Sequence, residues 1–316
     1  MAENARQKDH DPRVHVDATQ LRRLGAQSRA LSLLPRQPAQ SVLNGRHASR
    51  LRGRGLNFEE LRNYLPGDDV RSIDWKVTAR TGEPHVRVYT EERDRPALLL
   101  VDQRMSMFFG SQVYMKSVIA AEAAAIAAHR VLAQSDRVGG IVFGDDAIAE
   151  HLPQRRQATL HRLLGSIAKA NALLHAGHQT AVPIALNDVL RAAVRIAKTN
   201  TLVGIFSDFD GLDSQSEKLL QRLAQANDLI LFHVADPAAS ALPGNLRMAI
   251  SDGDVQADLD TSHAGTRARV DAALRGRLDN LYDWSRKYGF PLVPLTTQLP
   301  ALDQLMRLFG HTGRTR

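Results

Sequence analysis

The chain has 316 residues, of which 43% are apolar and 24% are charged, and it contains no cysteine. This composition is typical of a globular protein with a sizeable core, and the lack of cysteine excludes zinc–thiolate sites, thiol nucleophiles and disulfides. The net charge of +7 comes from residues 1–54, which hold eleven Lys or Arg and four Asp or Glu and leave the rest of the chain neutral.

Residues 1–39 are predicted to form a basic, partly helical arm. Leucines at helical spacing follow Asp17, a good helix-capping residue, and predict a helix from Asp17 to about Leu34 that Pro35 ends. Such an arm could bind nucleic acid or another anionic surface. Aromatic side chains, which stack on bases, make up only 5% of the chain, so nucleic-acid binding is the less favoured hypothesis.

Neither a signal peptide nor a membrane span is expected. Residues 1–17 lack the apolar core of a signal peptide. The longest apolar run, residues 120–128, is interrupted by Glu122 and is far too short to cross a bilayer. We therefore expect a soluble, cytoplasmic protein.

Residues 40–95 are predicted to form a small β-rich subdomain. Glycine and proline divide this segment into short pieces, and the alternating pattern of residues 85–90 indicates a half-exposed strand. The Arg and Asp residues of the segment are expected to form a polar network that ties it to the domain that follows. Trp75 is expected to be a core anchor.

Residues 96–316 are predicted to form an α/β domain, because strands and helices alternate along them. The predicted strands comprise residues 97–102, 138–143, 147–152, 201–208, 228–235 and 290–295. The predicted helices comprise residues 112–134, 155–170, 183–198, 214–226, 264–287 and 300–309. This alternation predicts a doubly wound, mostly parallel sheet with helices on both faces.

Two of the predicted strands end in a carboxylate, one at Asp102 and the other at Asp208. The carboxyl ends of parallel strands lie at the same edge of a sheet, and ligands bind there at the topological switch point. Two acids at that edge suit a hard divalent cation such as Mg²⁺ or Mn²⁺. We therefore expect a functional crevice at this edge.

The residues around these acids resemble the metal-ion-dependent adhesion motif of von Willebrand factor A domains. That motif is Asp-x-Ser-x-Ser at the end of the first strand, completed by a Thr and a second Asp further on. Asp102 and Ser106 match its first and last positions, Thr180 resembles the loop threonine, and Asp208 resembles the second acid. The resemblance implies that these four residues hold a metal ion and that the domain binds protein partners.

A longer block, RGLNFEELRNYLPGDDVRSIDWKVTART at residues 54–81, resembles the hallmark block of the bacterial family called domain of unknown function fifty-eight, or DUF58. The likeness covers roughly residues 40–210. It implies a von Willebrand factor A-like domain. Members of this family commonly accompany MoxR-type AAA+ ATPases as proposed adaptors in chaperone-like assembly or metal insertion, so the implied partner is such an ATPase or its client.

The chain departs from the adhesion motif at Arg104, which replaces the middle serine. Arginine has five hydrogen-bond donors and no acceptor, so it cannot be a metal ligand. Its guanidinium either pairs with a carboxylate and takes over the electrostatic role of the ion, or turns to solvent while water completes the metal's coordination. The predicted binding residues are therefore Asp102, Arg104, Ser106, Thr180 and Asp208, with Mg²⁺ or Mn²⁺ as a possible cofactor.

A third hypothesis is a phosphoryl-transfer or hydrolytic enzyme that uses Asp102 and Asp208. Phosphatases that form an aspartyl phosphate need Asp-x-Asp, whereas Arg104 occupies the place of the second acid. The sequence also has no Gly-x-Ser-x-Gly elbow, Walker loop or Gly-x-Gly-x-x-Gly after a strand. We therefore expect a non-catalytic protein-interaction module. Lys116 and His233 could each face the crevice, but a solvated lysine and a core histidine are the favoured interpretations.

Overall fold

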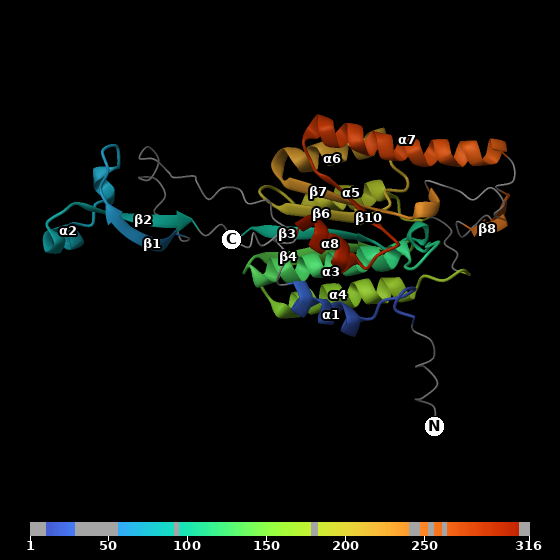
Figure 1. Ribbon diagram of the computed structural model, residues 1–316, viewed down its shortest axis with the longest axis horizontal. Coiled ribbons are helices and arrows are strands. Elements are labelled where there is room, and N and C mark those ends of the chain that lie inside the picture. Colours follow the sequence, from blue (N-terminus) through green and yellow to red (C-terminus); the bar gives the residue numbers. More distant parts are fainter. Residues whose placement is uncertain are drawn as a thin grey trace, which may run out of the picture. The chain divides into compact units, whose positions relative to one another are not determined.

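The computed structural model describes residues 11–28, 56–91, 95–177, 183–239, 247–251, 256–260 and 264–309. The chain divides into two units (Figure 1). The larger unit contains residues 1–33 and 95–316, and the smaller unit contains residues 34–94.

The large unit is built on a six-stranded sheet with the strand order β10-β7-β6-β3-β4-β5. Its strands are β3 (Pro96–Asp102), β4 (Arg137–Phe143), β5 (Ile148–Gln154), β6 (Leu202–Ser207), β7 (Asp228–Ala235) and β10 (Leu292–Thr296). All neighbouring strands are parallel except β4 and β5. In β3 and β6 nearly every residue is buried, because helices cover both faces of the sheet.

Helices lie on both faces of this sheet (Figure 1). One face carries α1 (Ala18–Gln27), α3 (Lys116–Ala133), α4 (Gln157–Ala172) and α8 (Ala301–Phe309), and the other carries α5 (Leu186–Ile196), α6 (Ser214–Ala226) and α7 (Ala264–Tyr288). The prediction of an α/β fold with a mostly parallel sheet flanked by helices is confirmed. None of the described helices is long and apolar enough to span a bilayer.

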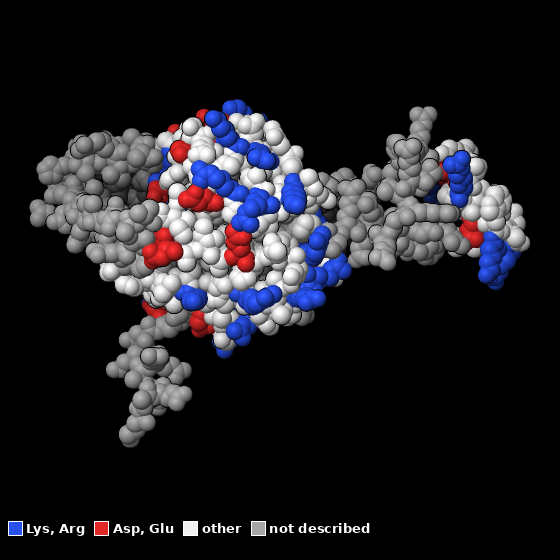
Figure 2. Space-filling model, turned by 180° about the vertical axis from the view of Figure 1, so that it is seen from behind, with Lys and Arg blue, Asp and Glu red and all other residues white. Residues whose placement is uncertain are grey.

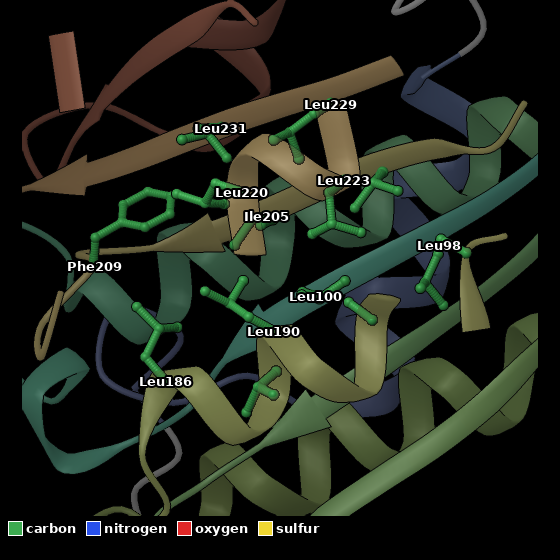
Figure 3. Packing of buried hydrophobic residues seen from close by; sticks show 14 of the residues in the cluster. Leu98, Leu100, Leu186, Leu190, Ile205, Phe209, Leu220, Leu223, Leu229 and Leu231 are labelled. Atoms are coloured by element: carbon green, nitrogen blue, oxygen red, sulfur yellow. The ribbon is translucent and has the colours of Figure 1, made fainter. Parts of the chain in front are cut away.

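Two kinds of packing hold these layers together. On the α5–α7 face, leucines from α5 and α6 meet apolar side chains of β3, β6 and β7 (Figure 3). On the opposite face, α3 presents alanines that are almost completely buried, and such short side chains let the helix lie close to the central strands. On β4, a Cβ at Gly140 would lie 2.6 Å from the carbonyl oxygen of Leu99, so glycine is needed there.

The N-terminal helix begins where the sequence predicts and ends earlier. The Asp17 carboxylate caps α1 by accepting hydrogen bonds from the backbone N–H groups of Thr19 and Gln20. The helix ends at Gln27, so the prediction of an end near Leu34 is wrong. α1 packs against α3 and α4, which makes this part of the arm a component of the large unit. Residues 29–39 lie outside the described residues.

The small unit contains an antiparallel pair of strands, β1 (Leu56–Asn63) and β2 (His85–Glu91). The predicted strand at residues 85–90 is confirmed. A helix that the sequence did not predict, α2 (Trp75–Thr81), lies between the strands, capped by Asp74 and ended by Gly82 at a φ of 80°. A short 3-10 helix (Val70–Ser72) precedes it.

Trp75 of the small unit is not a core anchor, because it is 67% exposed. It is the first residue of α2, a seven-residue helix that has no buried residue. The expected Arg–Asp network is represented by Arg62, whose guanidinium donates two hydrogen bonds of 2.7 and 2.8 Å to the Asp68 carboxylate. This pair lies within the small unit.

A second antiparallel strand pair belongs to the large unit and was not predicted. It consists of β8 (Arg247–Ser251) and β9 (Gln256–Asp260). The two strands are five residues each, and β9 is mostly polar.

Candidate functional site

Asp102 and Asp208 lie at the carboxyl edge of the sheet, where β3 and β6 are neighbours. β3 pairs with β4 on one side and with β6 on the other, and Val101 lies opposite Phe206 in the β3–β6 register. The chain runs from β3 to β4 and later places β6 on the far side of β3. The edge between β3 and β6 is therefore a topological switch point.

The Asp102 carboxylate is fully buried and held from several directions. Its Oδ1 accepts hydrogen bonds from the backbone N–H and the Nε of Arg104, each 3.0 Å long. Its Oδ2 accepts one of 2.7 Å from an Arg104 terminal nitrogen and one of 2.6 Å from the Ser207 hydroxyl. This bidentate arrangement is the strong geometry for an arginine–carboxylate pair.

Arg104 is almost as deeply buried as its partner, with 8% of its side chain exposed. The same terminal nitrogen donates a 3.1 Å hydrogen bond to the backbone carbonyl of Asp210, and the guanidinium lies 5.5 Å from the ring centre of Phe143. Burial alone would lower the pKa of Arg104, but the charge of Asp102 and the hydrogen bonds to it outweigh burial and raise it. Arg104 is therefore a permanent cation.

Asp208 is paired with a second cation, Lys116, in the first turn of α3. The Lys116 Nζ lies 2.7 Å from Asp208 Oδ2, and the two side chains are 13% and 6% exposed. Asp208 Oδ1 accepts a 3.0 Å hydrogen bond from the Asp210 backbone N–H and a long one of 3.4 Å from the Ser106 hydroxyl. Burial alone would raise the pKa of Asp208, but the charges of Lys116 and Arg104 lower it well below its usual range.

The backbone just after Asp208 is left-handed, which is rare for a bulky residue. Phe209 has a φ of 57°, and its backbone N–H donates a 2.8 Å hydrogen bond to the Ser207 hydroxyl. The Phe209 ring is completely buried and points into the core with the leucines of α5 and α6 (Figure 3). Core packing thus holds this turn, and the turn places Asp208 and Asp210 at the edge of the sheet.

A third ion pair is more exposed than the first two. Asp210 pairs with Arg277 of α7, and their side chains are 48% and 25% exposed, so this pair is partly exposed to solvent. His233 is on β7, and the centre of its ring lies 6.2 Å from the ring centre of Phe209. Burial lowers the pKa of His233 to about 4, so it is neutral near pH 7.

The loop between β3 and α3, residues 103–115, is anchored by two further carboxylates. The backbone N–H of Met105 donates a 2.7 Å hydrogen bond to Asp145, which follows β4. The backbone N–H of Ser111 donates one of 2.8 Å to Asp236, which follows β7. Acids after two other strands of the sheet, β4 and β7, therefore hold this loop in place.

The N-terminal segment also contacts this loop. The Val16 N–H donates a 2.8 Å hydrogen bond to the side chain of Asn171, whose amide in turn donates one of 2.9 Å to the side chain of Gln103. The Met115 N–H donates a 2.9 Å hydrogen bond to the Arg13 carbonyl. The segment before α1 is thus linked to both ends of the loop at residues 103–115.

Four of the five residues predicted for binding are brought together by the structure. Asp102, Arg104, Ser106 and Asp208 lie at the switch point, and Thr180 lies outside the described residues. The expectation that Lys116 is solvated is wrong, because it forms the buried pair with Asp208. Sequence reasoning also missed three residues that complete the site: Ser207, Asp210 and Arg277.

We call Asp102, Arg104, Ser106, Lys116 and Asp208 the switch-point site. Within the described part of the chain, no group of three or more His, Asp or Glu side chains is placed to hold a metal ion. Each acid of the site is already neutralised by its own cation. As arranged, these residues do not fit a divalent ion.

The fold and the site define an α/β protein with a charge-paired site at the switch point of a mostly parallel sheet. The profile of the family described as "Protein of unknown function DUF58" matches residues 60–278, which is more than half of the chain. The chain belongs to this family.

Relatives of similar length occur in mycobacteria. The chain is 29% identical over 300 residues to uncharacterized proteins of Mycobacterium bovis and of Mycobacterium tuberculosis, and the alignment covers 92% of this chain and 90% of theirs. Among solved structures, the Deinococcus radiodurans RO (RSR) protein matches with a TM-score of 0.29 and 15% identity, over 58% of this chain and 35% of that one. The chain thus spans about a third of that structure, and so distant a match does not inform the function.

Proposed function

We propose that this chain is a non-catalytic protein-interaction module with a von Willebrand factor A-like domain, and that it is an adaptor for a MoxR-type AAA+ ATPase. Two observations support the proposal. The block at residues 54–81 resembles the hallmark of a family whose members commonly accompany such ATPases. Of the adhesion-like residues, Asp102 and Ser106 lie at and just after the end of β3, Asp208 follows β6, and the three converge on one switch point.

The observation that carries the proposal is the way in which the acids of the site are engaged. Asp102 has no exposed surface, and both of its oxygens accept hydrogen bonds from Arg104. A carboxylate held in this way is a poor nucleophile and a poor general base, because it must first lose a bidentate ion pair. A rigid, charge-paired site at a sheet edge is better suited to recognition than to turnover.

Recognition would take place at the outer edge of the site. Two guanidinium groups flank Asp210 there: Arg104 contacts its carbonyl, and Arg277 pairs with its carboxylate. An acidic side chain of the partner would compete with the half-exposed Asp210 carboxylate for Arg277. Exchange of one carboxylate for another at a partly exposed pair keeps the guanidinium paired throughout, so the contact can form and break at a small energetic cost.

The face of the large unit seen in Figure 2 and the basic arm offer less reason for a specific contact. On the face of the large unit seen in Figure 2, basic and acidic side chains are both spread over the described surface. Much of the arm that carries the basic excess lies outside the described residues. Binding of nucleic acid through that arm stays a hypothesis.

The proposal can be tested by binding of the full chain to the purified MoxR-type ATPase encoded by the same genome, measured by biolayer interferometry. Arg277→Glu should weaken the affinity at least about tenfold, because it opposes an acidic partner group. Lys287→Glu, on the same helix and 62% exposed at its side chain, is the matched control and should change the affinity by less than about twofold.

Two results would count against the proposal. If the native chain does not bind the ATPase at micromolar concentration, the adaptor role is refuted. If it binds and both variants bind equally well, the partner contacts another surface.

A further inference from the structure

We infer that Arg104 and Lys116 together take the place of a divalent cation at the switch-point site, so that the native site is complete without a metal ion. The inference rests on the proposed function, which takes this site to be an adhesion-like site. Metal binding at the site can nevertheless be tested without any protein partner.

Charge balance is the first argument. Asp102 and Asp208 contribute two negative charges at adjacent strand ends. Arg104 and Lys116 contribute two positive charges, and each lies within hydrogen-bond distance of its own acid, at 2.7 Å. The net charge of the four side chains is zero, as it would be with two acids around one divalent ion.

The position of each cation is the second argument. Arg104 occupies the middle position of the adhesion-like motif, and its guanidinium donates two hydrogen bonds to the carboxylate of Asp102 at the first position. Lys116 is the first residue of α3 and reaches the carboxylate of Asp208, which follows the neighbouring strand β6. Each acid therefore has its own cation, and the two cations come from different elements.

Direct competition is the third argument. Mg²⁺ requires oxygen ligands at about 2.0–2.1 Å in near-octahedral geometry. An ion bound to both Asp102 and Asp208 would have to displace Arg104 and Lys116 or lie beside two fixed positive charges. The Arg104 and Lys116 side chains are 8% and 13% exposed, so neither can move to solvent without a rearrangement of the site.

An oxygen-rich site would remain if both cations were removed. The Ser207 hydroxyl lies 2.6 Å from Asp102, and the Ser106 hydroxyl lies 3.4 Å from Asp208. Two carboxylates and two hydroxyls are ligands that Mg²⁺ and Mn²⁺ accept. Substitution of Arg104 and Lys116 should therefore convert the site into a metal site.

The test is calorimetric titration of MgCl₂ and MnCl₂ into the EDTA-treated full chain. The native protein should show no binding at millimolar metal. The double variant Arg104→Ser/Lys116→Ala should bind Mn²⁺ with a Kd at or below about 1 mM, and Mn²⁺ should raise its melting temperature in a manner that EDTA reverses.

A matched control separates a local effect from a general change in charge. Arg191→Ser/Lys287→Ala also removes one Arg and one Lys, but from ion pairs whose basic side chains are 48% and 62% exposed. It should bind no more metal than the native protein. If the double site variant does not fold, the single variant Lys116→Ala keeps the Arg104–Asp102 pair and should bind Mn²⁺ at millimolar concentration, where the native chain shows no binding.

Two outcomes would overturn the inference: metal binding by the native chain as tight as that of the site variants, or no metal binding by a folded site variant. Because no ATPase takes part in the titration, failure of the proposed function would leave this result unchanged.

Discussion

Replacement of Arg104 by methionine should strongly destabilise the large unit. Methionine keeps much of the aliphatic stem of the side chain but removes the charge and the two hydrogen bonds that the Arg104 guanidinium donates to Asp102. The hydrogen bond from the Arg104 backbone N–H stays. The Asp102 carboxylate has 0% of its side chain exposed and would be left without its cation. Loss of one partner from a buried ion pair costs about 3–5 kcal/mol.

That cost is a large part of the stability of a typical domain, which is about 5–15 kcal/mol. For a unit of this size, each kcal/mol lowers the melting temperature by roughly 2–4 °C, so a decrease of roughly 6–20 °C is expected. The control Arg191→Met breaks an exposed pair within α5 and should cost less than about 1 kcal/mol.

Urea unfolding at pH 7, followed by circular dichroism, measures both variants against the native chain. In the double variant Asp102→Leu/Arg104→Met much of the lost stability should return, because neither charge then remains unpaired. The reasoning is refuted if Arg104→Met is no less stable than Arg191→Met.

Three further predictions concern the surroundings of the site. Burial lowers the pKa of His233 from 6.5 to about 4, so between these pH values only the unfolded chain binds this proton. The free energy of unfolding should therefore be highest above pH 6.5 and fall by up to about 3 kcal/mol as the pH is lowered to 4. Urea unfolding of His233→Gln should show a smaller fall over the same pH range. Gly140→Ala should cost about 1–3 kcal/mol in the same assay, because its Cβ would lie 2.6 Å from the Leu99 carbonyl oxygen, whereas a neutral effect would contradict the close approach of β4 to β3. Asn171→Ala removes the link between Val16 and the loop after β3 and should lower the free energy of unfolding by about 1–3 kcal/mol. In this variant the backbone amides before α1 should exchange faster with deuterium than in the native chain. Unchanged exchange there would contradict the link.

The sequence predicted the sheet well where a strand is apolar throughout. The residues of β3 and β6 are buried on both faces, and such strands read as continuous hydrophobic runs. The acids that follow these runs were identified for the same reason, since the end of an apolar run marks the end of a strand. The boundary of α1 was less certain, because leucines at helical spacing continue past Gln27, where the helix ends.

The pairing of charges could not be predicted in the same way. Lys116 lies in the first turn of α3, and its distance from Asp208 depends on the path of the loop before it and on the turn at Phe209. Neither is encoded in a periodic pattern. Arg277 is farther still along the chain, so its pairing with Asp210 is evident only from the three-dimensional structure.

The most direct test of the central claim, that the switch-point edge is a protein-binding surface, is hydrogen–deuterium exchange of the full chain with and without the MoxR-type ATPase. Residues 103–115 and 208–213, the loops that follow β3 and β6, should exchange more slowly when the ATPase is bound. Protection confined to the small unit or to the outer helices α1 and α4, with these two loops unchanged, would contradict it.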